Sequence, residues 1–353
     1  MPLVRPVALA GGATIAIVTP SWPGPGLLPD RFDRAVSALR AAGFVPRPMP
    51  HARLVGDGVR GWLAGSPAER VADLHRAFAD PEVAAVLIAI GGDHSAQLLE
   101  ELDFELIRAN PKVFCGYSDS TVLLHAVHAA TGLVTCYGPA LLPEFGDLDG
   151  PAPETVRHFT AVTGRSRPAG ALPRFGWTSV EDRAETDAAG RPRRREVPEP
   201  RRILRPGRAT GPLLAGCLPS LRHLVGTRWR AEHAGRILAI EVPDGGYHVA
   251  DADADLTLLR NTGVLGELAG LVIGRTPGWS AEEIAQLDAC ALEATRGYRL
   301  PVLGGLEFGH VSPMCTLPIG VRATLDGDEL TIDEPAVREP AVSESGGIQR
   351  LSR

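Results

Sequence analysis

The sequence predicts an α/β protein of two domains: an N-terminal, doubly wound parallel sheet and a smaller, β-rich C-terminal α/β domain. Three observations support this prediction. The chain has 353 residues, the length of about two ordinary domains. Strand and helix patterns alternate over residues 13–138, as they do in a doubly wound sheet. A second set of such patterns begins at Gly211, beyond a segment of different composition.

The first domain is expected to alternate buried strands with amphipathic helices. Ser66-Pro67-Ala68-Glu69 is a capping box with proline at the first helical position, so it marks the start of a helix. The unbroken apolar run at 85–90 is typical of a strand buried on both faces of a parallel sheet. Apolar spacing and glycine stops predict the remaining elements: strands at 14–18 and 113–115, and helices at 29–42 and from about 120 to 130.

The composition changes after the first domain. Residues 165–208 hold 12 arginines against 6 acidic residues, a local charge of +6 in a chain whose net charge is −6. Because it has several prolines and little apolar periodicity, this segment is predicted to be a linker or a long functional loop. The expected parts are an N-terminal domain (1–145), a linker and basic loop (146–210), a C-terminal domain (211–335) and a polar, frayed tail (336–353).

The second domain is expected to combine strands, helices and a closing hairpin. Asp326-Gly327 lies between two alternating stretches and predicts a hairpin over 320–332. Elsewhere in this domain we expect strands at 237–240, 268–273 and 301–303, and helices at 251–261 and 281–295.

Charge, hydropathy and cysteine usage exclude several classes of protein. The net charge of −6 gives no electrostatic case for a nucleic acid polymer or an anionic membrane as partner. No apolar run approaches the roughly 20 residues that span a bilayer. Residues 5–10 resemble a short export signal, but two glycines interrupt the run and we favour a first strand. Five cysteines without a C-x-x-C pair favour a reducing compartment, so we expect a cytoplasmic protein.

The first glycine-bearing turn, Gly91-Gly92-Asp93-His94, directly follows the apolar strand at 85–90. A double glycine lets a ligand approach the backbone closely and leaves N–H groups free to donate hydrogen bonds. The turn lacks the third glycine of a dinucleotide fingerprint, and there is no Walker lysine. It is therefore a weak signal for a nucleotide.

The second turn, Gly116-Tyr117-Ser118-Asp119-Ser120-Thr121, joins a short strand to a helix. Ser118 would project its hydroxyl at the top of the sheet, and the Asp119 N–H would be placed to donate to an oxyanion. The turn resembles the nucleophile elbow G-x-S-x-G, with Ser120 in place of the last glycine. The hexapeptide alone favours a simple helix cap, because Ser and Asp are the preferred capping residues.

A serine nucleophile needs a base and a group that orients it. His310 lies in a glycine-flanked loop after the strand at 301–303, where functional residues concentrate, although a structural role fits it equally well. Glu241 ends the apolar strand at 237–240, where an unpaired carboxylate is costly. Asp244 is the competing acid, although its simplest role is to make a turn. His125 and His128 are expected to be packing or surface residues of the helix after Ser118, and four further histidines are expected in surface-like settings: His51, His75, His158 and His233.

Together these motifs resemble the LD-carboxypeptidase family of serine peptidases, in particular the branch related to the microcin C immunity peptidase. The resemblance covers nearly the whole chain, from Ile15 to about Leu325, and rests on the order and spacing of several stretches. These stretches are Ile15-Ala16-Ile17-Val18-Thr19-Pro20-Ser21, Leu63-Ala64-Gly65-Ser66 with Glu69-Arg70, Ile90-Gly91-Gly92-Asp93, Gly116-Tyr117-Ser118-Asp119, Phe308-Gly309-His310 and Leu317-Pro318-Ile319-Gly320.

The resemblance implies a triad of Ser118, Glu241 and His310 in a cleft between the two domains, usually within a homodimer. It also implies an oxyanion hole made by the N–H groups of Gly92 and Asp119, and a reaction that needs neither metal nor cofactor. Members of the family commonly have Gly-Gly-Asn-Leu where this chain has Ala215-Gly216-Cys217-Leu218. A thiol thus replaces a substrate-contacting amide. Cys217 as a nucleophile is conceivable, but a buried apolar cysteine is the simpler interpretation.

Two substrate classes remain open: murein tetrapeptides, and the amide that joins a peptide or amino acid to a nucleotide. Phe175-Gly176-Trp177 in the basic segment favours the second, because an indole can stack on a base and arginine suits phosphate. The expected substrate-binding residues are Gly91, Asp93, Trp177 and Cys217. The alternative outside enzymes is an inactive ligand-binding α/β protein, which the presence of all three triad residue types disfavours.

Overall fold

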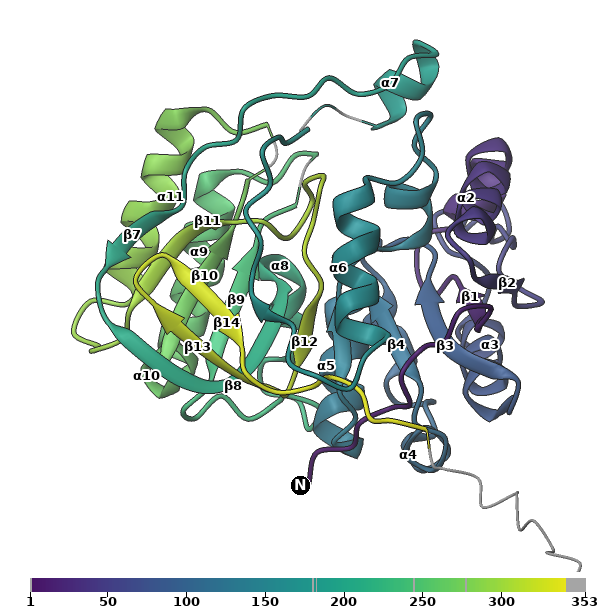
Figure 1. Cartoon of the computed structure of the whole chain (residues 1–353), viewed down its shortest axis with the longest axis horizontal. Helices are drawn as coiled ribbons and strands as arrows, with labels where there is room; N and C mark the ends of the chain where they lie inside the picture. The colour runs from purple at the N-terminus through teal and green to yellow at the C-terminus, as the bar shows by residue number, and fades with distance from the viewer. Residues whose placement is uncertain (1, 180, 182, 244, 277, 341–353) are drawn as a thin grey trace, which may run out of the picture.

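The structure, a computed structural model, describes residues 2–179, 181, 183–243, 245–276 and 278–340. Two β-sheets lie side by side, one mainly from the N-terminal part of the chain and one from the C-terminal part (Figure 1). This arrangement confirms the predicted α/β fold with two domains. The predicted strands and helices are present, with their ends shifted by only a few residues. Asp244, the competing acid, lies outside the described residues.

The first sheet has six strands in the order β12-β5-β4-β3-β1-β2. All its pairs are parallel except that of β12 with β5. The chain order of this part is β1 (Thr14–Val18), α1 (Gly24–Leu27), α2 (Pro29–Ala41), β2 (Val45–Pro48), α3 (Pro67–Ala79), β3 (Val83–Ile88), η1 (Ser95–Leu98), α4 (Phe104–Ala109), β4 (Val113–Gly116), α5 (Ser120–Thr131), β5 (Thr135–Tyr137), η2 (Leu141–Phe145) and α6 (Pro153–Thr163).

The second sheet has eight strands in the order β6-β14-β13-β8-β9-β10-β11-β7, and its central strands β8 to β11 are parallel. The chain order of this part is β6 (Gly170–Ala171), α7 (Arg183–Ala188), β7 (Arg202–Arg205), β8 (Arg208–Cys217), α8 (Leu218–Leu221), η3 (Arg222–Leu224), β9 (Ile237–Glu241), α9 (Val249–Asn261), α10 (Val264–Glu267), β10 (Gly270–Gly274), α11 (Ala281–Ala294), β11 (Val302–Leu306), β12 (Leu317–Ile319), β13 (Arg322–Asp326) and β14 (Glu329–Ile332).

The basic segment 165–208 has more regular structure than the predicted linker or loop. It supplies β6 and β7, which pair with β14 and β11 and form the two edges of the second sheet. Several of its arginines form ion pairs inside the molecule, among them Arg201 with Glu307 at 2.6 Å and Arg202 with Asp288 at 2.6 Å. The composition predicted a linker or a long functional loop because a count of charges does not show which carboxylates the fold brings near.

The two halves of the chain are joined through their sheets. In sequence β12 lies between β11 and β13, both strands of the second sheet, yet it completes the edge of the first sheet by pairing with β5. The end of the described chain also packs onto its beginning: Arg338 donates its N–H to the Pro6 carbonyl, and Ala336 and Val337 are buried. The prediction of a frayed tail from residue 336 is therefore wrong for 336–338, because Ala336 and Val337 pack into the core and Arg338 is held by its backbone hydrogen bond. Residues 341–353 lie outside the described residues.

Within the described residues, no helix combines the length and the apolar content that crossing a bilayer requires.

Candidate active site

The candidate site lies where three strands of the first sheet end. Trp22 follows β1, Gly91 and Gly92 follow β3, and Ser118 follows β4. The carboxyl ends of parallel strands share one edge of a sheet, and the chain leaves β1 toward β2 on one side while β3 lies on the other. Such a change of direction opens a crevice in which α/β proteins bind ligands.

Ser118 is held in a backbone conformation that is unusual for serine. Its φ is +63°, and it is the one non-glycine residue with a positive φ in the described part of the chain. Its carbonyl accepts hydrogen bonds from the N–H and hydroxyl of Thr121, and its N–H donates to the Tyr137 hydroxyl at 3.1 Å. A strained serine between a strand and a helix is the geometry of a nucleophile elbow. An ordinary helix cap would not require it.

Asp119 fixes the neighbouring glycine loop instead of capping its own helix. Its buried carboxylate accepts hydrogen bonds from the N–H groups of His94 and Ser95 and from the Ser95 hydroxyl. A Cβ on Gly91 would lie 2.8 Å from the Ser118 Cβ, so only glycine allows this close approach. In the part of the chain that the structure describes, no hydrogen bond takes up the N–H of Gly92 or of Asp119. Neither N–H is therefore committed to an acceptor among the described residues.

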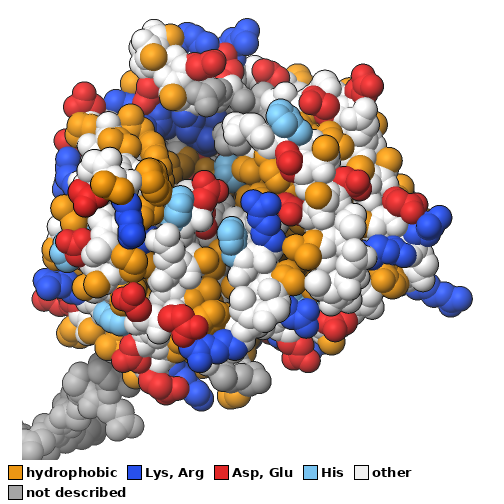
Figure 2. Space-filling model, turned by 180° about the vertical axis from the view of Figure 1, so that it is seen from behind, with side chains coloured by type: hydrophobic (Ala, Val, Ile, Leu, Met, Phe, Trp, Pro, Cys, Tyr) orange, Lys and Arg blue, Asp and Glu red, His pale blue; other side chains and the backbone are white. Residues whose placement is uncertain are grey.

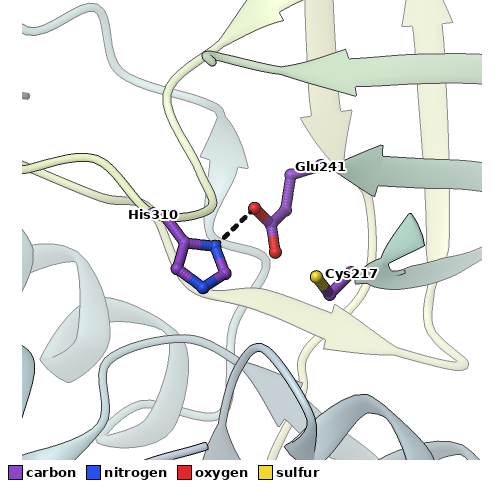
Figure 3. A group of neighbouring side chains, drawn as sticks. All are labelled: Cys217, Glu241 and His310. Carbon is purple, nitrogen blue, oxygen red and sulfur yellow. Dashed lines mark hydrogen bonds and ion pairs between the residues drawn. The ribbon is translucent and has the colours of Figure 1, made fainter. Parts of the chain in front are cut away.

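Glu241 and His310 come together from a strand end and a loop of the second domain. Glu241, at the end of β9, is fully buried, and its carboxylate accepts a hydrogen bond from His310 Nδ1 at 2.7 Å (Figure 3). Gly309 has a φ of +100°, and a Cβ there would lie 2.8 Å from the Glu241 side chain. The glycine before His310 thus lets the imidazole reach the carboxylate.

The Glu241 carboxylate is held in its charged form by three donors. Tyr137 donates its hydroxyl to Oε1, His310 donates to Oε2, and the Cys217 thiol also bonds to the carboxylate. Burial alone would raise the pKa of Glu241, but these partners lower it below its ordinary value. Burial and the Glu241 charge raise the pKa of the Cys217 thiol well above its usual value, so this cysteine stays protonated and is a poor nucleophile.

Cys217, Glu241 and His310 also offer potential metal ligands, since one atom from each lies within 4.8 Å of the others. Figure 3 shows the three side chains pointing toward one another from separate strand and loop ends. Their mutual hydrogen bonds already satisfy the carboxylate. The arrangement is accounted for by an acid that orients a histidine.

Ser118 and His310 line the same cleft, a cavity of about 550 Å³ to which both domains contribute. The cleft opens beneath α7, where Figure 2 shows a hollow bordered by hydrophobic and basic side chains. Gly91 and Gly92 also line it. The other expected substrate-binding residues do not: Asp93 is exposed at the surface and Cys217 is buried behind Glu241.

Trp177 lies outside this cleft, contrary to its expected place. It lines a second, smaller cavity with Asp147 and Ser312, and the Arg195 guanidinium stacks on its indole at 4.1 Å. The basic segment nevertheless forms part of the cleft wall, through α7 rather than through the tryptophan.

Comparison with known proteins identifies the family of the chain. The pattern of the LD-carboxypeptidase N-terminal domain matches residues 15–138, and that of the C-terminal domain matches residues 210–325. The chain belongs to the LD-carboxypeptidase family. It is therefore a serine-type peptidase, as the sequence resemblance implied.

The relatives of this peptidase have names that indicate different activities. A probable murein peptide carboxypeptidase from Bacillus subtilis is 32% identical, over 96% of each chain. The microcin C7 self-immunity protein MccF from Escherichia coli is 29% identical, over 92% of this chain and 93% of its own. A structure of MccF with adenosine monophosphate has a TM-score of 0.86 and 28% identity, and covers 95% of this chain and all of that one. Other MccF structures contain aspartyl sulfamoyl adenosine or glutamyl sulfamoyl guanosine.

Ion pairs hold α7 of the peptidase over the cleft. Arg31 of α2 bonds to Asp187 at 2.7 Å and to Asp147 at 2.5 Å, and its side chain is only 6% exposed. Arg183 at the start of α7 bonds to the buried Glu144 at 3.1 Å. Paired charges with so little exposure are screened far less than surface pairs. The helix is therefore anchored to the first domain rather than free above it.

Several residues of the site were missed by sequence reasoning. Tyr137 and Trp22 belong to no recognisable motif, and only the pairing of β5 with β4 and the course of the loop after β1 bring them to Ser118. Outside the site, His158 and His233 were expected in surface-like settings, but both are buried.

Proposed function

We propose that Ser118, Glu241 and His310 form the catalytic triad of a serine amidase that cleaves aminoacyl- or peptidyl-nucleotide-like compounds. One observation carries the proposal: a serine with a φ of +63° shares its cleft with a histidine whose other side is bonded to a buried carboxylate. Nucleophile, base and orienting acid thus come from different elements and serve one cavity.

The geometry supports a conventional acyl transfer. Ser118 Oγ attacks the amide carbonyl while His310 Nε2 takes the hydroxyl proton, and Glu241 stabilises the resulting imidazolium through Nδ1. The oxyanion accepts hydrogen bonds from the N–H groups of Gly92 and Asp119. His310 then returns the proton to the leaving amine, and a water molecule releases the acyl group by the same steps in reverse. No metal or cofactor enters this scheme.

The nucleotide-linked substrate class is favoured by the MccF structures that hold nucleotide compounds. The position of Trp177 outside the cleft weakens the original reason for this choice. A murein tetrapeptide is the second candidate, supported by the murein peptide carboxypeptidase among the relatives.

The proposal includes a reducing compartment and a homodimer. All five cysteines are unpaired, as expected for a protein of the cytoplasm. Light scattering coupled to size exclusion tests the dimer, for which the expected mass is twice that of the chain.

A direct test combines labelling with substrate cleavage. A fluorophosphonate probe should label the wild type but not Ser118→Ala, and the modified peptide should contain residue 118. Purified enzyme is then offered an aminoacyl sulfamoyl adenosine series and a murein tetrapeptide. Labelling of another residue would contradict the proposed nucleophile, and efficient release of D-alanine from the tetrapeptide alone would select the second candidate.

A further inference from the structure

The wall of the cleft beside Ser118 is largely apolar. One part of it is formed by Trp22, Leu28 and Ile90, which follow β1, begin α2 and follow β3. Another part is formed by Ala184 and Ala188 of α7. A cavity with apolar walls and a few polar groups at the reacting centre is the usual form of a small-molecule site.

Trp22 is fixed in place by contacts with three glycines. Its N–H donates to the Gly91 carbonyl at 3.1 Å, which ties it to the glycine turn. A Cβ on Gly24 would lie 2.7 Å from the indole, and a Cβ on Gly92 would lie 2.8 Å from the Trp22 backbone nitrogen. The indole thus packs on Gly24, and Trp22 lines the same cavity as Gly92 and Ser118. It is a preorganised aromatic surface next to the reacting carbonyl.

The part of the cleft wall formed by α7 is shaped by the spacing of two alanines. Ala184 and Ala188 are four residues apart, so their side chains lie on one face of the helix, and both line the cleft. Their methyl groups leave the cavity open where longer side chains would fill it. The ion pairs of Arg31 and Arg183 keep this face at a fixed distance from Trp22.

The cations in the cleft wall are already neutralised. Arg31 is paired with Asp147 and Asp187, and Arg183 is paired with Glu144. A substrate carboxylate entering here would lose hydration and would have to compete for guanidinium groups that hold α7 in place. An uncharged group would meet neither cost.

We infer that this cleft holds an apolar subsite, between Trp22 and α7, for an aromatic or branched aliphatic group next to the scissile amide. The inference rests on the proposed amidase function and names its substrate class: phenylalanyl- or leucyl-type compounds rather than the aspartyl and glutamyl compounds found in MccF structures. Two features favour the apolar class. Arg31 and Arg183 are each already paired with an acidic residue, and Trp22 offers an apolar surface in the same cleft.

Binding to Ser118→Ala tests the subsite without requiring turnover. Calorimetry should show that phenylalanyl sulfamoyl adenosine binds roughly 10- to 100-fold more tightly than the aspartyl compound, the range that burial of one apolar side chain supplies. Adding Trp22→Ala should remove most of this difference. Trp62→Ala is the matched control, because Trp62 is 52% exposed and does not line the cleft.

A charge placed on α7 gives a second test of the preference for an uncharged side chain. Ala188→Arg puts an unpaired guanidinium into the cleft and should shift preference toward the aspartyl compound by about tenfold or more. Ala189→Arg, on the exposed neighbouring residue that does not line the cleft, should leave the preference as it was.

Equal or tighter binding of the aspartyl compound to the Ser118→Ala protein would overturn the subsite, as would failure of both compounds to bind. Tight, Trp22-dependent binding of the phenylalanyl compound without cleavage by the wild type would leave the subsite standing and would contradict only the amidase function.

Discussion

The hydroxyl of Tyr137 connects the proposed nucleophile to the acid of the proposed triad. It accepts the Ser118 N–H at 3.1 Å and donates its own proton to Glu241 Oε1. Tyr137→Phe keeps the ring and its edge contacts with Tyr117 and Phe308 but removes both hydrogen bonds. The elbow then loses one anchor, and the charged carboxylate loses one of its donors.

The magnitude follows from the charge on Glu241. A hydrogen bond to a charged group contributes about 1.5–3 kcal/mol. If Glu241 must be charged to stabilise the imidazolium in the transition state, that loss corresponds to a kcat lower by roughly 10- to 150-fold. KM should change little, because Tyr137 does not line the cleft. The assay is steady-state hydrolysis of the best aminoacyl substrate, with the unfolding free energy of each variant measured by urea titration.

Tyr247→Phe is the matched control, since the Tyr247 hydroxyl donates to a different carboxylate, Asp255, at 2.8 Å. Both variants should lose a similar amount of stability, but only Tyr137→Phe should lose kcat. A Tyr137→Phe enzyme with kcat within twofold of the wild type would refute the reasoning. So would an equal loss of kcat in the two variants.

Three further outcomes are expected. Ser118→Ala should lower kcat at least about 1,000-fold with the melting temperature nearly unchanged, and residual activity near wild type would exclude Ser118 as nucleophile. Gly91→Ala should lower kcat about 100-fold because its methyl would lie 2.8 Å from the Ser118 Cβ, while Gly11→Ala, with open space around it, should be neutral in the same assay. Stability should fall as the pH drops from about 6.5 toward 4, because burial lowers the pKa of His125 to about 3 and that of His158 to about 4. The unfolded chain then binds protons that the folded chain does not, and a flat stability profile in urea titrations across this range would contradict that account.

Features encoded in contiguous residues could be predicted from the sequence. The capping box at Ser66 and Glu69 forms as expected, and the apolar run at 85–90 corresponds to buried β3. The turn around Ser118 was also recognisable, although the hexapeptide alone favoured a cap. An elbow differs from a cap by the positive φ of the serine, and the residue types alone do not determine that angle.

Features that depend on distant contacts could not be predicted. Trp177 was placed in the site because it lies among arginines in the sequence, but Arg195 stacks on it in another cavity. Tyr137 reaches Glu241 across 104 positions of sequence, in a contact between the last residue of β5 and the last residue of β9. Neither residue has a local pattern that reports its tertiary neighbours.

The strand β12 has a consequence for how the protein is made. During synthesis the first sheet leaves the ribosome early, yet the partner of its β5 edge is at Leu317–Ile319. Until that strand emerges, the edge exposes unpaired N–H and C=O groups that can pair with another nascent chain. Expression of residues 1–210 alone should therefore give aggregated protein. A peptide spanning 311–340, supplied during refolding, should improve its solubility by covering that edge.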